Sequence, residues 1–126
     1  MMIVEKQIDT LLSKLKSSDF RSKFKLKGKD LEYFQSKGMD TILEHGSDFL
    51  NSRLAPANPK NDTKQTPYKG HPIFTAQHAT ATCCRECLEK WHGIGRGREL
   101  NEDEKVYILT VWKRWLLSQV DREIEK

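Results

Sequence analysis

The chain has 126 residues, of which 37% are hydrophobic and 32% charged, and a formal net charge of +4 at pH 7. This composition excludes a disordered chain, and no run approaches the ~20 apolar residues that a membrane-spanning helix requires. The N-terminus has no recognisable secretory signal, so we expect a cytoplasmic protein that folds as a single domain over residues 1–126.

The first segment, residues 1–17, predicts an amphipathic helix. Its apolar residues recur at helical spacing, at Val4, Ile8, Leu11, Leu12 and Leu15. From Phe20 to Lys27 the period changes to two, because apolar residues alternate with Arg and Lys. That alternation is typical of a short extended segment with a basic outer edge.

The basic edge carries most of the positive surplus, since residues 1–40 hold nine Lys and Arg against six acidic residues. A patch of this kind can contact phosphates, so nucleic acid is a candidate partner, although a solvated face is the commoner explanation. No helix-turn-helix or other reader motif accompanies it. The candidate nucleic-acid-binding residues are Arg21, Lys23, Lys25, Lys27 and Lys29.

Two short helices are predicted next, the first opened by Asp30 and ended by Gly38, the second opened by Asp40 and running to about Leu54. Residues 55–72 contain all four prolines and predict a loop that is long for a compact domain. Loops of that length tend to be functional or mobile.

The last part of the chain again predicts helices. One spans about Phe74 to Trp91 and ends at Gly93, and the other spans 101–124. At the start of the second, Asn101 and Glu104 have the spacing of a capping box. The fold class is therefore mostly α, with a long Pro-rich loop and room for one short extended segment.

The segment 71–94 is the candidate functional centre, because residues 71–92 alone contain three cysteines and three of the four histidines. Thiolate and neutral imidazole are the ligands that zinc prefers, and a tetrahedral site needs four donors. Zinc is therefore the expected cofactor, with another transition metal as the alternative. Cys84 and Cys87 have the C-x2-C spacing that can clasp one ion. The preferred ligand set is His78, Cys84, Cys87 and one of Cys83 or His92, with His71 as an outside candidate.

Two other interpretations of this segment stay open. Cysteine is often buried as a small hydrophobe, so the three could pack a helix beside Trp91. One cysteine could also be a nucleophile activated by a nearby histidine. The sequence does not decide whether the protein is an enzyme or what its oligomeric state is.

The residues also resemble a known family. The run HATATCCRECLEKWH (residues 78–92), together with FRSKFKL (20–26) and MDTILEHGSDFLNSRLAP (39–56), is similar to the uncharacterised bacterial DUF4186 family. The resemblance covers about residues 18–120, and one departure is Gly95, where the family pattern has proline. It implies a small intracellular protein of bacterial or phage origin and no particular activity.

The resemblance also draws attention to the polar loop before the cysteines, which could line a ligand-binding surface or merely satisfy the loop backbone. The loop residues concerned are Arg53, Asn61, Asp62, Lys64 and Gln65. Three functions remain in competition: a zinc-stabilised module that contacts nucleic acid, a metal-dependent or thiol enzyme, and a structural or partner-binding protein.

Overall fold

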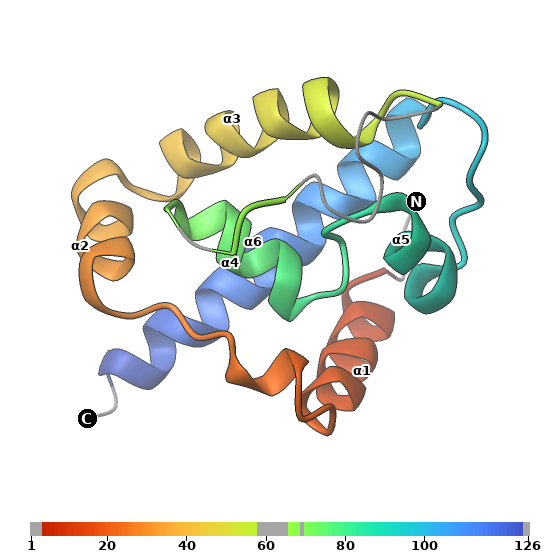
Figure 1. Cartoon of the computed structure of the whole chain (residues 1–126). Coiled ribbons are helices and arrows are strands. Elements are labelled where there is room, and N and C mark those ends of the chain that lie inside the picture. The colour runs from red at the N-terminus through yellow and green to blue at the C-terminus, as the bar shows by residue number, and fades with distance from the viewer. Residues whose placement is uncertain (1–3, 58–65, 69, 125–126) are drawn as a thin grey trace.

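The computed structural model describes residues 4–57, 66–68 and 70–124 (Figure 1). Over these residues the chain forms six α-helices and no strand, which confirms the mostly α class. Residues 58–65 and 69 of the predicted Pro-rich loop lie outside the described part. No helix in the described part is long and apolar enough to cross a membrane.

The long helix α6 (Glu102–Ile124) is the central element, and it contacts α1 (Val4–Lys16), α3 (Met39–Phe49) and α4 (Pro72–Ala79). Figure 1 shows it crossing the molecule with α3 on one side and α1 on the other. It carries a row of fully or nearly fully buried side chains, which are Ile108, Val111, Trp112, Trp115 and Leu116. In both α1 and α6 the apolar residues recur at helical spacing, so each helix has an apolar face that packs against the same core.

The packing of α3 on α6 requires a glycine at position 46. A Cβ there would lie 3.0 Å from the side chain of Ile73 and 3.1 Å from that of Trp112, which is tighter than ordinary van der Waals contact. Gly46 therefore lets the α3 backbone approach the large Trp112 ring, which is fully buried.

The predicted helix starts at Asp30 and Asp40 are wrong. Helix α2 is Gly28–Lys37, α3 begins at Met39, and the N-cap residues Lys27 and Gly38 make no side-chain capping hydrogen bond. Both aspartates lie inside the first turn, where their charge is favourable beside the positive helix end. Beyond α3 the chain continues as a short π-helix, Leu50–Leu54.

The predicted extended segment at residues 20–27 is only partly extended. Arg21–Lys23 form a turn of 3-10 helix, and Phe24 and Lys27 have extended backbone angles without belonging to a strand. Because the alternation is interrupted by this turn, Arg21 does not lie on a common basic edge with the lysines that follow. Its position is described with the site below.

The single helix predicted from Phe74 to Trp91 is in fact two, α4 and α5 (Arg85–His92), separated by residues 80–84. Ala81 has a φ of 59° there, which no helix accommodates. The hydroxyl of Thr80 donates to the carbonyl of Ala76 at 2.7 Å, and Trp112 Nε1 donates to the hydroxyl of Thr82 at 2.7 Å. The break is thus held by threonine side chains that satisfy local polar groups.

Two predicted helix ends are confirmed. Gly93 ends α5 in the left-handed conformation, with a φ of 71°. Asn101 and Glu104 form the capping box of α6, because the Glu104 amide donates to Asn101 Oδ1 at 2.8 Å and the Asn101 amide donates to Glu104 Oε1 at 3.0 Å.

Arg85, the first residue of α5, is fully buried and holds four carbonyl groups together. Its guanidinium donates to the carbonyl oxygens of Gly95 at 2.8 Å, Arg98 at 2.9 Å, Pro56 at 3.0 Å and Leu54 at 3.3 Å. The end of the π-helix, the start of the Pro-rich segment and the Gly-rich connector before α6 are therefore joined at one side chain.

We expect Arg85→Met to lower the free energy of unfolding by about 3 kcal/mol, because it leaves several buried carbonyl groups without donors. Urea denaturation followed by circular dichroism would measure this loss. Arg96→Met is the matched control. Arg96 makes ion pairs at the surface with Glu86 at 3.7 Å and Glu89 at 3.6 Å, so its substitution should leave stability nearly unchanged. Equal effects of the two substitutions would contradict the bracing role of Arg85.

His71 has a structural role at the start of α4. Its Nδ1 accepts a hydrogen bond from the Ile73 amide at 3.0 Å, which makes it the N-cap residue, and its Nε2 lies 3.1 Å from His45 Nδ1. Burial, with a smaller contribution from the positive charge of His45, lowers the pKa of His71 to about 4. The folded protein therefore keeps His71 neutral.

Between pH 6.5 and 4 the unfolded chain should bind one proton more at His71 than the folded chain, so stability should decrease as the pH falls through this window. We expect His71→Asn to reduce by about one the number of protons taken up on unfolding in this pH window, because Asn caps a helix equally well and does not titrate. The free energy of unfolding should then depend less steeply on pH. His71→Ala should instead lose stability at every pH. Denaturation curves between pH 4 and 7.5 test this, and an unchanged slope in His71→Asn would contradict it.

Candidate metal centre

The three cysteines come together at the start of α5. Cys84 is the N-cap residue, and its Sγ accepts a hydrogen bond from the Cys87 amide at 3.4 Å. Cys83 precedes it in the helix break, and its Sγ lies 3.7 Å from Cys87 Sγ. All three sulfur atoms lie within 4.8 Å of one another. Among the described residues, these three cysteines form a group that could hold a metal ion.

The spacing of the sulfurs fits a tetrahedral ion. With zinc–sulfur bonds of about 2.3 Å, two sulfurs on one tetrahedral ion lie about 3.8 Å apart. The distance of 3.7 Å between Cys83 Sγ and Cys87 Sγ agrees with that value. Cys83 and Cys84 are buried and Cys87 is partly exposed, so an ion could reach the group from the Cys87 side. Donor type and spacing therefore both suit a thiophilic metal.

Arg21 is the residue of the site that sequence reasoning placed incorrectly. Its Nη2 donates to Cys87 Sγ at 3.1 Å and its Nη1 to Cys83 Sγ at 3.5 Å. The same Nη1 donates to the carbonyl oxygen of His78 at 2.8 Å. A 3-10 turn, anchored by the hydrogen bond from the Arg21 amide to Ser18 Oγ, directs the guanidinium inward. The cysteines follow more than 60 residues later, so no local pattern signals this contact.

The sulfurs and the guanidinium form one electrostatic unit. Hydrogen bonds from the thiols of Cys83 and Cys84, and then the charge of Arg21, lower the pKa of Cys87 well below its ordinary value. Hydrogen bonds with Cys83 and Cys87 raise the pKa of Cys84, and the pKa of Cys83 is also raised, by its hydrogen bond with Cys87 and by burial. Without a metal, the arrangement therefore favours one thiolate, on Cys87, beside two neutral thiols.

The histidines lie outside the sulfur group. His92 donates from Nε2 to the Thr80 carbonyl at 2.8 Å and accepts at Nδ1 from the Tyr107 hydroxyl at 2.8 Å, so both of its nitrogens are occupied. Burial lowers the pKa of His92, consistent with a neutral ring. His71 uses both nitrogens for the α4 cap and the contact with His45.

His78 differs from the other two. Its Nε2 donates to the carbonyls of Pro67 at 3.0 Å and Thr66 at 3.2 Å, which leaves the lone pair on Nδ1. Nδ1 is buried and has no hydrogen-bond partner in the described part of the chain. The ring stacks against those of Tyr68 and Phe24, with centroids 4.5 and 5.2 Å away. Of the predicted histidine ligands, His78 alone keeps an available donor atom, and its coordination of an ion stays a prediction.

The other predicted site residues do not join this group. The side chains of Lys23, Lys25, Lys27 and Lys29 are exposed. Arg53 lies on the π-helix with its guanidinium about 5.1 Å from the Phe49 ring and 5.2 Å from the Phe74 ring. The predicted loop ligands Asn61, Asp62, Lys64 and Gln65 lie outside the described residues.

A family comparison agrees with the resemblance seen in the sequence. The family described as "Domain of unknown function (DUF4186)" matches residues 9–117. The chain belongs to this family. The matched DUF4186 region contains Arg21, all three cysteines and all of the histidines. No solved structure matches the chain.

Proposed function

We propose that this DUF4186 protein is a metal-binding domain in which Cys83, Cys84 and Cys87 hold a zinc ion. The observation that carries the proposal is the convergence of three sulfurs within 4.8 Å at one helix start. Packing alone gives cysteines no reason to direct their sulfurs at one another, whereas a shared ion does. When bound, zinc would supply Lewis acidity or a fixed cross-link at this point.

The charge of Arg21 supports the same proposal. Three thiolates around a divalent ion leave one negative charge, which is costly to bury without a partner. Arg21 already donates to two of the sulfurs and would balance that charge. Donors placed behind the ligands in this way strengthen metal binding.

The fourth ligand decides between a structural and a catalytic ion. Structural zinc sites have four protein ligands, whereas catalytic sites have three and one exchangeable position. The described residues supply three sulfurs and, outside that group, the Nδ1 atom of His78, which has no hydrogen-bond partner among them. A metal-dependent enzyme therefore stays an alternative within the proposal.

Protein purified without a histidine tag should contain about one equivalent of zinc per chain by elemental analysis. Cys84→Ser and Cys87→Ser should each abolish it, because each removes a ligand. Arg21→Met should keep the ion but bind it roughly tenfold more weakly. His78→Ala should lower affinity only if His78 is the fourth ligand, and His45→Ala, which leaves the sulfurs untouched, is the control. Absence of stoichiometric metal in the parent protein would refute the proposal.

A thiol enzyme is the second candidate, favoured by the 3.1 Å contact between Arg21 Nη2 and Cys87 Sγ. Cys87 is also the cysteine that is partly exposed. In metal-free protein at pH 7, we expect iodoacetamide to alkylate Cys87 first, and Arg21→Met to slow this reaction about tenfold through loss of thiolate. Mass spectrometry of timed samples gives the order. Equal alkylation rates in the two proteins would count against Arg21 as an activator.

Contact with nucleic acid is a further part of the proposal. The exposed lysines at positions 23, 25, 27 and 29 could meet phosphates, whereas Arg21 is committed to the sulfurs. No reader motif accompanies these lysines in the sequence, so such binding would depend chiefly on charge.

A further inference from the structure

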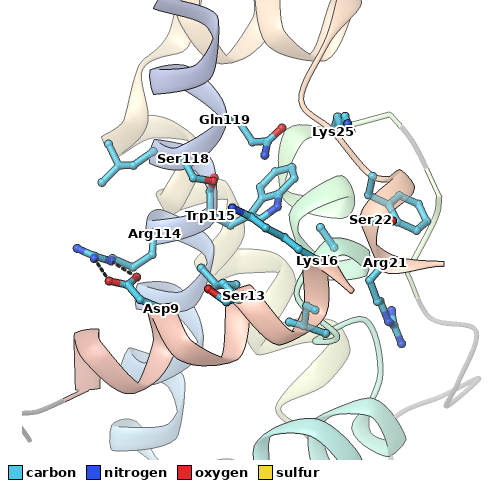
Figure 2. A pocket seen from close by; sticks show the side chains of 15 residues that line it. Asp9, Ser13, Lys16, Arg21, Ser22, Lys25, Arg114, Trp115, Ser118 and Gln119 are labelled. Atoms are coloured by element: carbon cyan, nitrogen blue, oxygen red, sulfur yellow. Dashed lines mark hydrogen bonds and ion pairs between the residues drawn. The ribbon is translucent and has the colours of Figure 1, made fainter. Parts of the chain in front are cut away.

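A cleft of about 690 Å³ lies between α1, the segment around Arg21–Lys25 and α6 (Figure 2). That volume is within the range of small-molecule sites in proteins. The zinc proposal leaves this cleft unexplained, because its lining includes none of the three cysteines.

Cationic side chains outnumber carboxylates in the lining of the cleft. Lys16 and Lys25 line it, and neither makes an ion pair or hydrogen bond within the described part of the chain. Figure 2 shows the Lys16 side chain extending from α1 toward α6. The one carboxylate in the lining, Asp9, is paired with Arg114 at 2.5 Å. The cleft therefore has an excess of unneutralised positive charge.

A neutral donor is held in place among these cations. Gln119 Oε1 accepts the Leu26 amide at 3.0 Å, which fixes the orientation of the side-chain amide. The NH2 group is consequently on the other side, and Figure 2 shows it directed toward the cleft beside Trp115. Two lysines and an oriented amide suit a ligand rich in acceptor oxygens.

Apolar side chains form another part of the lining. Leu12 and Leu15 of α1 and Trp115 of α6 contribute to it, and Phe24 closes the side toward His78. Leu15 and Trp115 are 2% and 7% exposed, so they belong to the packed core and present rigid walls. A ligand that only carried charge would leave this apolar surface unused.

We propose that this cleft binds an organic phosphate of mononucleotide size. Its phosphate group contacts Lys16, Lys25 and the Gln119 amide, and its ring lies against the apolar wall formed by Leu12 and Trp115. A phosphate matches the lining better than a carboxylate does, because its double charge and three terminal oxygens use both lysines and the amide. The phosphate can belong to a free nucleotide or to the end of a nucleic acid strand.

The cleft adjoins the cysteine site through Arg21. This residue lines the cleft, and its guanidinium points away toward Cys87 on α5 (Figure 2). The proposal does not depend on a metal at the cysteines. Binding can therefore be measured in Cys84→Ser protein as well as in the parent, and the result stands whichever way the zinc proposal is decided.

Isothermal titration calorimetry with adenosine 5′-monophosphate, adenosine and inorganic phosphate as separate probes tests the proposal. We expect the nucleotide to bind about tenfold or more tightly than either part alone, because only the nucleotide uses both the donors and the apolar wall. Lys16→Gln and Lys25→Gln should each weaken it about tenfold by removing a charge-assisted hydrogen bond. No binding of the nucleotide, or equal binding of adenosine, would overturn the proposal.

Two exposed lysines outside the lining provide matched controls. Lys6→Gln and Lys14→Gln, both on α1, remove the same charge and should leave nucleotide binding within twofold of the parent value. Equal losses in controls and test variants would mean that only net charge matters, which overturns a defined site. A short oligonucleotide with and without a 5′-phosphate distinguishes a free nucleotide from the end of a nucleic acid strand. If the ligand is a strand end, the 5′-phosphorylated oligonucleotide should bind more tightly than the free nucleotide.

Discussion

The buried guanidinium of Arg85 is the interaction on which the rest of the structure depends. A cation is expensive to bury, and here four carbonyl oxygens replace the lost water. Those carbonyls come from segments on either side of the site, at residues 54–56 and 95–98. Because Arg85 directly follows Cys84, the side chain that joins these segments also fixes where α5 begins.

The start of α5 in turn determines the chemistry of the cysteines. In one continuous helix, Cys83 and Cys84 would point about 100° apart and would lie on either side of Cys87, at the i−4 and i−3 positions. The break at residues 80–84 instead places both outside the helix and makes Cys84 the N-cap. The positive end of α5 also favours negative charge on the sulfurs. The helix break thus sets the backbone positions from which Cys83 and Cys84 approach Cys87.

Local features of the fold could be predicted from the sequence, and features that depend on distant residues could not. The periodicity of α1, the left-handed Gly93 and the Asn101–Glu104 capping box each depend on neighbours within a few positions. The helix break depends on Trp112, 30 residues away, which donates to Thr82. Asp30 failed as a predicted helix start because the chain enters α2 at Gly28, before any aspartate.

The same distinction applies to the candidate site. The C-x2-C spacing identified Cys84 and Cys87 because both lie on one helical turn. Residue type suggested three histidines as ligands. Whether a ring nitrogen is available depends on what each ring contacts in the tertiary structure, which the sequence does not show. His92 is occupied by Tyr107 and Thr80, whereas His78 retains Nδ1.

Arg21 gives the two proposed sites a physical connection. Its guanidinium neutralises the sulfurs on one side, and its side chain forms part of the cleft wall on the other. Negative charge in the cleft would attract the same guanidinium that the thiolates hold, since both sites lie close to it and charges interact strongly in partly buried surroundings. Occupation of either site would therefore weaken the hold of Arg21 on the other. By thermodynamic linkage that effect must be reciprocal, so a ligand in the cleft and a metal at the cysteines would oppose each other's binding by the same factor.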